Sequence, residues 1–218
     1  MGNEKSFWHT ESGHTKACYQ SASNTSLIVS HVIFETERLI GRHLEPEDLV
    51  PMLAVYGDAD AMRWVGDGQP LVQDQCARWL EVTENNYRLR GYGMSALIER
   101  SSGEVVGFCG LVHPGGQLEA EIKYALKRSR WGLGLATEAA RAMLVYGAEV
   151  MGLRSIIATI APENSASHRV LVKAGMVPSS LRTNSDGTQI QVFAWQSHED
   201  AVQPLSADVV STDGNESP

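Results

Sequence analysis

The junction RWGLGLATEA, residues 130–139, is the feature that most constrains how this chain folds. Gly132 and Gly134 remove side chains where the backbone turns, and apolar residues at helical spacing follow as far as Val150. Basic residues precede the turn, and residues 122–137 contain no acid. The helix directs unpaired N–H groups and the positive end of its dipole at the turn. This arrangement predicts a phosphate or pyrophosphate site; the alternative is a glycine turn with a solvated basic rim.

Strands and helices are expected on both sides of this junction. The strands are indicated by period-two alternation, by short turns between apolar runs, and by one continuously apolar run that is typical of a strand covered on both faces. The expected strands are residues 38–44, 92–100, 103–112, 118–126, 154–161, 176–183 and 188–195. The expected helices are residues 45–58, 71–90, 134–150 and 164–175. Strands mixed with crossing helices indicate an α+β or mixed α/β domain.

The charge is unevenly distributed along the chain, and this suggests the domain limits. The net charge is −8, and residues 197–218 carry acids but no Lys or Arg. We therefore expect one domain at 32–196, a flexible N-terminal extension at 1–31 and a disordered acidic tail at 197–218. No broad basic face is present, so nucleic acid is not an expected partner.

Composition also excludes several other classes of protein. No apolar run is long enough to cross a bilayer, so we expect a soluble protein without a membrane partner. Cys18, Cys76 and Cys109 show no metal or redox spacing. Such a scattered set suits a reducing cytoplasm, with Cys76 and Cys109 as small core residues.

Two common phosphate-binding motifs do not fit the junction. A dinucleotide-binding fingerprint requires a third glycine where this chain has Thr137, and it requires an acid near the end of the next strand, which residues 154–161 lack. A P-loop requires Lys and then Ser or Thr after its second glycine, whereas Gly134 is followed by Leu135 and Ala136. A nucleotide-binding oxidoreductase is therefore disfavoured.

Three blocks of the chain resemble the GNAT N-acetyltransferases, and in particular the RimJ/RimL-type branch that acetylates protein N-terminal amines. These blocks are ETERLIGRHLEPEDL (35–49), EIKYALKRSRWGLGLATEA (121–139) and APENSASHRVLVKAGM (161–176). The resemblance covers roughly residues 32–196. It implies a central, mostly antiparallel twisted sheet of about seven strands, flanked by helices and splayed to receive acetyl-CoA.

The resemblance also implies where acetyl-CoA binds. Main-chain amides from Trp131 to Thr137 would hold the pyrophosphate, and the pantetheine arm would lie beside residues 122–126 like an added strand. The family contains a cofactor-contacting asparagine that matches Asn164, and the resemblance leaves Arg128 and Arg130 to supply positive charge. The residues implied in cofactor binding are Ile122, Tyr124, Leu126, Arg128, Arg130, Trp131, Gly132, Leu133, Gly134, Leu135, Ala136, Thr137, Asn164, Ser167, Arg169 and Lys173. No metal is implied.

Acetyl transfer to an amine requires a base, because only the neutral amine has a lone pair for attack on the thioester. Glu119 and Glu121 lie two residues apart on an expected strand, so they would share a face, and paired carboxylates would raise one pKa. Glu121, which matches a family block, is the first candidate for the base and Glu119 the second. Lys123 stands where the branch usually has Gly, and an alternative is that it pairs with Glu121 and keeps it ionised. The alternative is that both glutamates face solvent.

The leaving thiolate benefits from an acid. The family often has a Tyr seven residues after the helix Asn, where this chain has Leu171. The resemblance therefore leaves Ser167 as the candidate acid, although a hydrogen-bonding role in the first helical turn is equally open. Trp64 and Asp67, in the Gly-rich loop 62–70, are candidates for contacting a cationic acceptor amine.

The leading hypothesis is an N-acetyltransferase that acts by direct attack in a ternary complex of enzyme, acetyl-CoA and an amine. The branch favours a protein N-terminal amine as acceptor. A small-molecule amine, such as an antibiotic, polyamine or amino acid, is the alternative, and a non-catalytic acyl-CoA-binding module is another. The expected oligomeric state is a monomer or homodimer.

Overall fold

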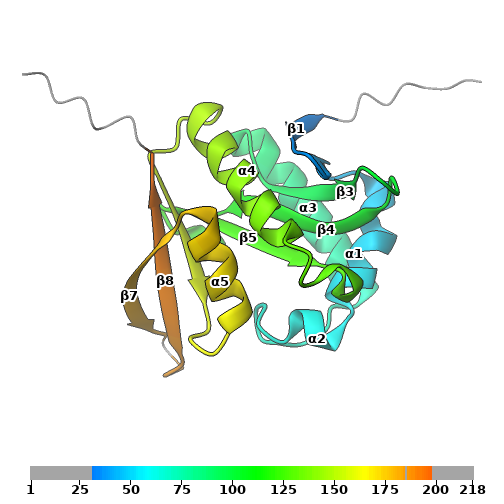
Figure 1. Cartoon of the computed structure of the whole chain (residues 1–218). Helices are drawn as coiled ribbons and strands as arrows, with labels where there is room; N and C mark the ends of the chain where they lie inside the picture. Colours follow the sequence, from blue (N-terminus) through cyan, green and yellow to red (C-terminus); the bar gives the residue numbers. More distant parts are fainter. Residues whose placement is uncertain (1–30, 185, 198–218) are drawn as a thin grey trace, which may run out of the picture.

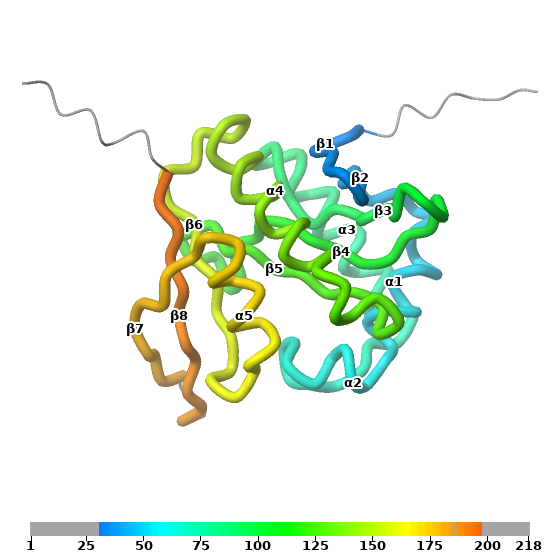
Figure 2. Tube along the Cα trace, in the orientation of Figure 1, coloured from blue at the N-terminus to red at the C-terminus, as the bar shows by residue number. Residues whose placement is uncertain are grey.

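The computed structural model describes residues 31–184 and 186–197, so the proposed N-terminal extension and acidic tail lie almost entirely outside the described residues. Eight strands form one sheet in the order β1-β2-β3-β4-β5-β6-β8-β7, with β1–β2 at one end and β7–β8 at the other (Figure 1, Figure 2). The strands are β1 Val32–Glu35, β2 Leu39–His43, β3 Met94–Glu99, β4 Val105–Val112, β5 Ala120–Leu126, β6 Ser155–Ile160, β7 Val177–Thr183 and β8 Gln189–Gln196.

The sheet is mostly antiparallel, as the sequence predicts. All neighbouring strands pair antiparallel except β5 and β6, which are parallel. The sequence analysis missed β1, because this edge strand has four residues and buries only Phe34 fully. It therefore lacks the alternation that would reveal it.

Helices cover both faces of the sheet. Figure 1 shows α4 (Leu135–Glu149) and α5 (Ser165–Ala174) in front of the sheet, with α3 (Gln73–Arg90) behind it. The short helices α1 (Leu49–Tyr56) and α2 (Ala59–Met62) belong to the α3 side. Each face has its own buried cluster, one around Met143 of α4 and one around Tyr56 of α1.

Three short 3-10 helices complete the structure: η1 Pro46–Asp48, η2 Pro114–Gly116 and η3 Arg128–Arg130. Cys76 and Cys109 are buried free thiols, as expected for core residues. No helix among the described residues is both long enough and apolar enough to cross a membrane.

The sheet opens between β5 and β6. Helix α4 connects these two strands, and their ladder contains only the pairs Ala120 with Ile156 and Glu121 with Ile157. Beyond Glu121, β5 stays paired with β4 through Leu126, while β6 stays paired with β8 through Ile160. The edge of β5 that faces β6 is therefore left without a neighbouring strand from Ile122 onward.

Candidate active site

The turn between β5 and α4 presents main-chain amides, as the sequence predicts. Gly132 and Gly134 have φ angles of 76° and 80°, in the left-handed region that side chains disfavour. Gly134 caps α4 without a side-chain hydrogen bond, and the first helical bond runs from the Glu138 N–H to the Gly134 carbonyl. The three amides before Glu138 therefore have no partner within the helix. They form the positive end of a helix of 15 residues.

Trp131 folds this turn back onto the end of β5. Its indole Nε1 donates to the Leu126 carbonyl at 2.9 Å. Two main-chain bonds close η3, from the Arg130 N–H to the Lys127 carbonyl at 2.8 Å and from the Trp131 N–H to the Arg128 carbonyl at 3.1 Å. The sequence analysis assigned a role to the Trp131 amide, whereas the structure shows that its side chain also fixes the turn.

The charges of Arg128 and Arg130 are already balanced by acids. Arg128 forms ion pairs with Asp58 and Asp60 at the start of α2. Arg130 makes a two-pronged contact with Glu99 of β3, at 3.1 and 2.9 Å. Both guanidinium groups thus connect the turn to other elements, and a role for these two arginines in cofactor binding stays a prediction.

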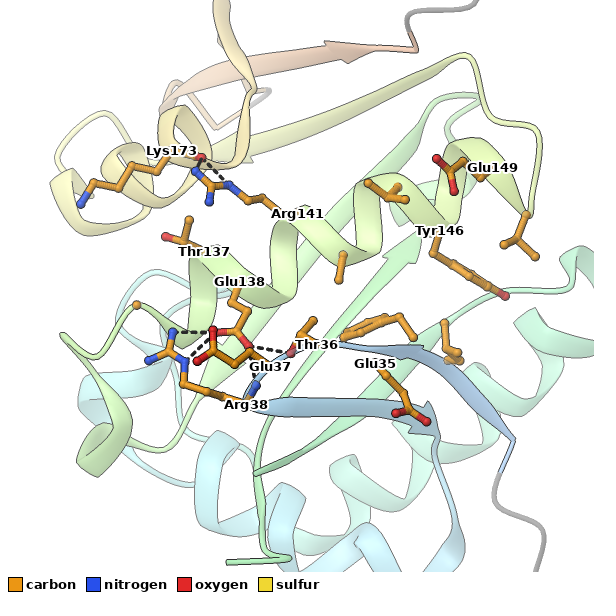
Figure 3. A pocket seen from close by; sticks show the side chains of 16 residues that line it. Glu35, Thr36, Glu37, Arg38, Thr137, Glu138, Arg141, Tyr146, Glu149 and Lys173 are labelled. Carbon is orange, nitrogen blue, oxygen red and sulfur yellow. Dashed lines mark hydrogen bonds and ion pairs between the residues drawn. The ribbon is translucent and has the colours of Figure 1, made fainter. Parts of the chain in front are cut away.

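Other cations lie close to the turn. A groove of about 760 Å³ runs along α4, and Figure 3 shows Arg38, Arg141 and Lys173 among the residues that line it. The Arg38 guanidinium donates to the Leu133 carbonyl at 2.8 Å, inside the turn. The Arg141 guanidinium donates to the Lys173 carbonyl at 2.8 Å and so joins α4 to the end of α5. Sequence reasoning missed Arg38 and Arg141, although Arg38 lies in the quoted block ETERL.

Glu121 lies where β5 and β6 separate, and it is buried, with 2% of its surface exposed. The Thr159 N–H donates to Oε1 of Glu121 at 3.1 Å, as does the Thr159 hydroxyl. A carboxylate oxygen thus occupies the place that a β5 carbonyl would take if the ladder continued. Glu121 is in this way a wedge between the two strands.

The Glu121 carboxylate has two further partners. The Lys123 ammonium forms an ion pair with Oε1, which realises the pairing suggested from the sequence, and it donates to the Thr159 hydroxyl at 3.2 Å. The Gln117 amide donates to Oε2 at 3.1 Å. Among the described residues, Oε2 therefore accepts one hydrogen bond, from Gln117, and a carboxylate oxygen can accept two.

Glu119 and Glu121 differ in their surroundings. Strand β5 begins at Ala120, so Glu119 lies just before it, and its exposed carboxylate is 3.9 Å from Arg182 of β7. Glu121 is buried beside Lys123 and Thr159.

The N-terminus of α5 borders the same opening. The Asn164 side chain is buried and caps α5 by accepting from the Ser167 N–H at 3.0 Å. The Tyr124 hydroxyl donates to the Ser167 carbonyl at 3.4 Å, across the gap between β5 and α5. Burial raises the pKa of the Tyr124 phenol far above its ordinary value, so this group stays protonated. Arg169 and Lys173 are exposed on α5.

The candidate acceptor residues lie on an exposed loop after α2. Trp64 has 42% of its surface exposed, and the Arg63 guanidinium lies 5.1 Å from the centroid of its ring. Asp67 accepts from the Gln69 N–H at 3.0 Å. The Arg63 guanidinium therefore already lies over the Trp64 ring, which was a candidate for contacting a cationic acceptor amine. Among the described residues, no group of His, Cys, Asp or Glu could hold a metal ion.

An opened sheet, with a glycine turn and a helix N-terminus next to the opening, is the arrangement that the resemblance to the GNAT N-acetyltransferases implied. Comparison of the sequence with known families supports this class. Residues 38–177 match the acetyltransferase (GNAT) domain. The chain belongs to the GNAT acetyltransferase family, and the resemblance found from the sequence is confirmed.

The chain is similar to known proteins in sequence and in fold. The uncharacterized protein YkkB of Bacillus subtilis is 34% identical over 146 residues, which span 65% of this chain and 83% of YkkB. A GNAT-family acetyltransferase from Bacillus anthracis has a similar crystal structure, with a TM-score of 0.63 and 25% identity over 74% of this chain and 96% of that one. The RimL ribosomal L7/L12 alpha-N-protein acetyltransferase, solved with coenzyme A, shares the fold with a TM-score of 0.65 and 18% identity, over 76% of this chain and 98% of that one.

Proposed function

We propose that this N-acetyltransferase transfers the acetyl group of acetyl-CoA to a protein N-terminal amine, and that the opening between β5 and β6 is where transfer occurs. The observation that carries the proposal is the two-pair ladder between these strands, directly beside a glycine turn with free helical amides. The pantetheine arm would pair with the free edge of β5, and the amides from Trp131 to Thr137 would receive the diphosphate.

Glu121 is the proposed base, through Oε2, which has one recorded partner. The amine nitrogen forms a bond to the thioester carbonyl carbon, and the carbon–sulfur bond then breaks. The amine proton passes to Oε2 of Glu121, directly or through a water molecule. The Ser167 hydroxyl would donate a hydrogen bond to the departing thiolate, which takes up a proton from solvent while Glu121 releases the amine proton to solvent.

The proposed acceptor class follows the RimJ/RimL likeness of the sequence blocks and of the fold. A small-molecule amine is the alternative, because one fold serves many acceptors. The pairing of Glu121 with Lys123 favours a second candidate, an acyl-CoA-binding module without catalysis, because a carboxylate held by an ammonium group is a weaker base.

One experiment separates these candidates. Coenzyme A release would be measured with purified protein, acetyl-CoA, and two acceptor panels: peptides with varied first residues, and small amines that include polyamines and aminoglycosides. Turnover with peptides alone supports the proposal. Turnover with small amines alone would show that the acceptor is a small-molecule amine and not a protein N-terminus. Coenzyme A binding without turnover on either panel supports the binding module.

The identity of the acid is tested by removing single hydroxyl groups. We expect Ser167→Ala to lower kcat by about 10²-fold, the lower end for acid catalysis, because thiolates are good leaving groups. Tyr124→Phe should have a smaller effect, because the Tyr124 hydroxyl donates to a carbonyl. Both are measured at saturating acetyl-CoA, with Ser165→Ala in the same helical turn as the matched control. A larger loss of kcat in Tyr124→Phe than in Ser167→Ala would show that Tyr124, and not Ser167, assists the leaving thiolate.

A further inference from the structure

The hairpin formed by β1 and β2 is bonded to the β5–α4 turn through one partly exposed cluster of polar groups. In Figure 3, Arg38 and Thr36 of the hairpin converge on Glu138 of α4. Oε1 of Glu138 accepts from the Thr36 hydroxyl at 2.6 Å and from the Arg38 N–H at 2.9 Å. Oε2 accepts from Nε of Arg38 at 2.7 Å and lies 2.6 Å from the second guanidinium nitrogen. The two side chains therefore meet in a bidentate pair, which fixes their relative geometry.

The charges of this pair are maintained by their surroundings. Partial burial of Glu138 opposes ionisation, but the hydrogen bonds from Thr36 and Arg38 outweigh it and lower the pKa of this carboxyl below its ordinary value. The carboxylate is thus present at neutral pH. The Arg38 guanidinium supplies the opposite charge of the pair.

Arg38 has a third contact, and this contact lies inside the turn. Its remaining nitrogen donates to the Leu133 carbonyl at 2.8 Å, between Gly132 and Gly134. In a trans peptide the carbonyl and the following N–H point in opposite directions. Holding the Leu133 carbonyl towards Arg38 therefore directs the Gly134 N–H away from the hairpin.

The turn has little packing of its own to hold it. Trp131 and Leu133 have 48% and 54% of their surfaces exposed. A Cβ added at Gly132 would meet no atom within 4 Å. Two glycines also give this segment a large conformational freedom. The Arg38 contact is thus one of few restraints on the orientation of its peptide planes.

We infer that Arg38, held by Glu138 and Thr36, is a positioning residue that orients the turn's amides for the diphosphate of coenzyme A. The inference rests on the proposed cofactor site. It links two of the blocks quoted from the sequence. Residues 35–49 contain Arg38, and residues 121–139 contain both groups that it binds, the Glu138 carboxylate and the Leu133 carbonyl. Arg38 acts through the backbone and needs no contact with the substrate.

The test compares Arg38→Gln with Arg38→Lys and Arg100→Gln. Arg100 is the matched control, because its guanidinium binds the same hairpin, at the Thr36 carbonyl and Glu35, without touching the turn. Isothermal titration with coenzyme A should show affinity weakened by about tenfold in Arg38→Gln, the value of one charged hydrogen bond. Arg38→Lys should be intermediate, since an ammonium cannot make the bidentate pair. Arg100→Gln should stay within about twofold of wild type.

A second readout separates this inference from the proposed function. Hydrogen exchange of the amides from Gly132 to Thr137, without ligand, should accelerate in Arg38→Gln and remain unchanged in Arg100→Gln. The KM for acetyl-CoA should rise in Arg38→Gln, while kcat at saturating acetyl-CoA changes little. Equal coenzyme A affinity and equal exchange in the two Gln variants would overturn the inference. A wild-type protein that does not bind coenzyme A would overturn the proposed function, and the exchange rates would still decide the role of Arg38.

Discussion

Glu121→Gln is expected to lower kcat by about 10²- to 10³-fold, within the range for loss of a general base. The amide keeps the shape of the side chain and can still accept from the Thr159 N–H, so the strands should remain wedged apart. It cannot take up a proton from the acceptor amine. The measurement is coenzyme A release at saturating acetyl-CoA and acceptor.

Two comparisons accompany this variant. Glu119→Gln distinguishes the two candidate bases, because Glu119 lies outside β5 and close to Arg182. Glu84→Gln, on the exposed face of α3, controls for the loss of a negative charge elsewhere. A Glu121→Gln protein with wild-type kcat would show that the carboxylate serves only as the wedge between β5 and β6.

Gly134→Val is expected to weaken coenzyme A binding by about 10- to 100-fold. The φ angle of 80° at this position costs a β-branched residue about 1–3 kcal/mol, and relaxation of the strain would rotate the amides at the start of α4. The new Cβ would lie 3.5 Å from the Arg38 guanidinium, an ordinary contact, so backbone strain and not a clash is the cause. Affinity is measured by isothermal titration calorimetry.

The matched control is Gly187→Val, which has a similar φ angle of 85° in the turn between β7 and β8. Both variants should lose comparable thermal stability, but only Gly134→Val should lose affinity. Equal affinity in the two variants would show that the turn's backbone does not determine coenzyme A binding.

Local sequence signals predicted most of the fold because they reflect local physics. Gly91 and Gly175, which end the expected helices, have positive φ angles at the C-caps of α3 and α5. The glycines of the junction likewise adopt the left-handed conformation that the turn requires. Periodicity and caps act over a few residues, so one sequence is sufficient to read them.

The site was harder to predict because its contacts join distant segments. Arg128 and Arg130 were expected to serve an anion, but acids of α2 and β3 hold them, and nothing near them in the sequence reveals those partners. Glu119 and Glu121 have the spacing of neighbours on one strand face, yet β5 starts between them. Arg38 and Glu138 are 100 positions apart, and no local pattern in the sequence links them, although they form an ion pair in the fold.

The short ladder between β5 and β6 has a consequence for how the chain folds. Strands β3 to β5 form a meander, and β7 and β8 form a hairpin, so both groups depend on contacts of modest sequence separation. The two groups of strands join only after α4 has crossed from β5 to β6. Closing this connection forms only two residue pairs between β5 and β6. Assembly of the two halves is therefore expected to be a late kinetic event, driven by burial beneath α4 and not by strand pairing. A change that slows folding without altering either half would then lie in the buried face of α4.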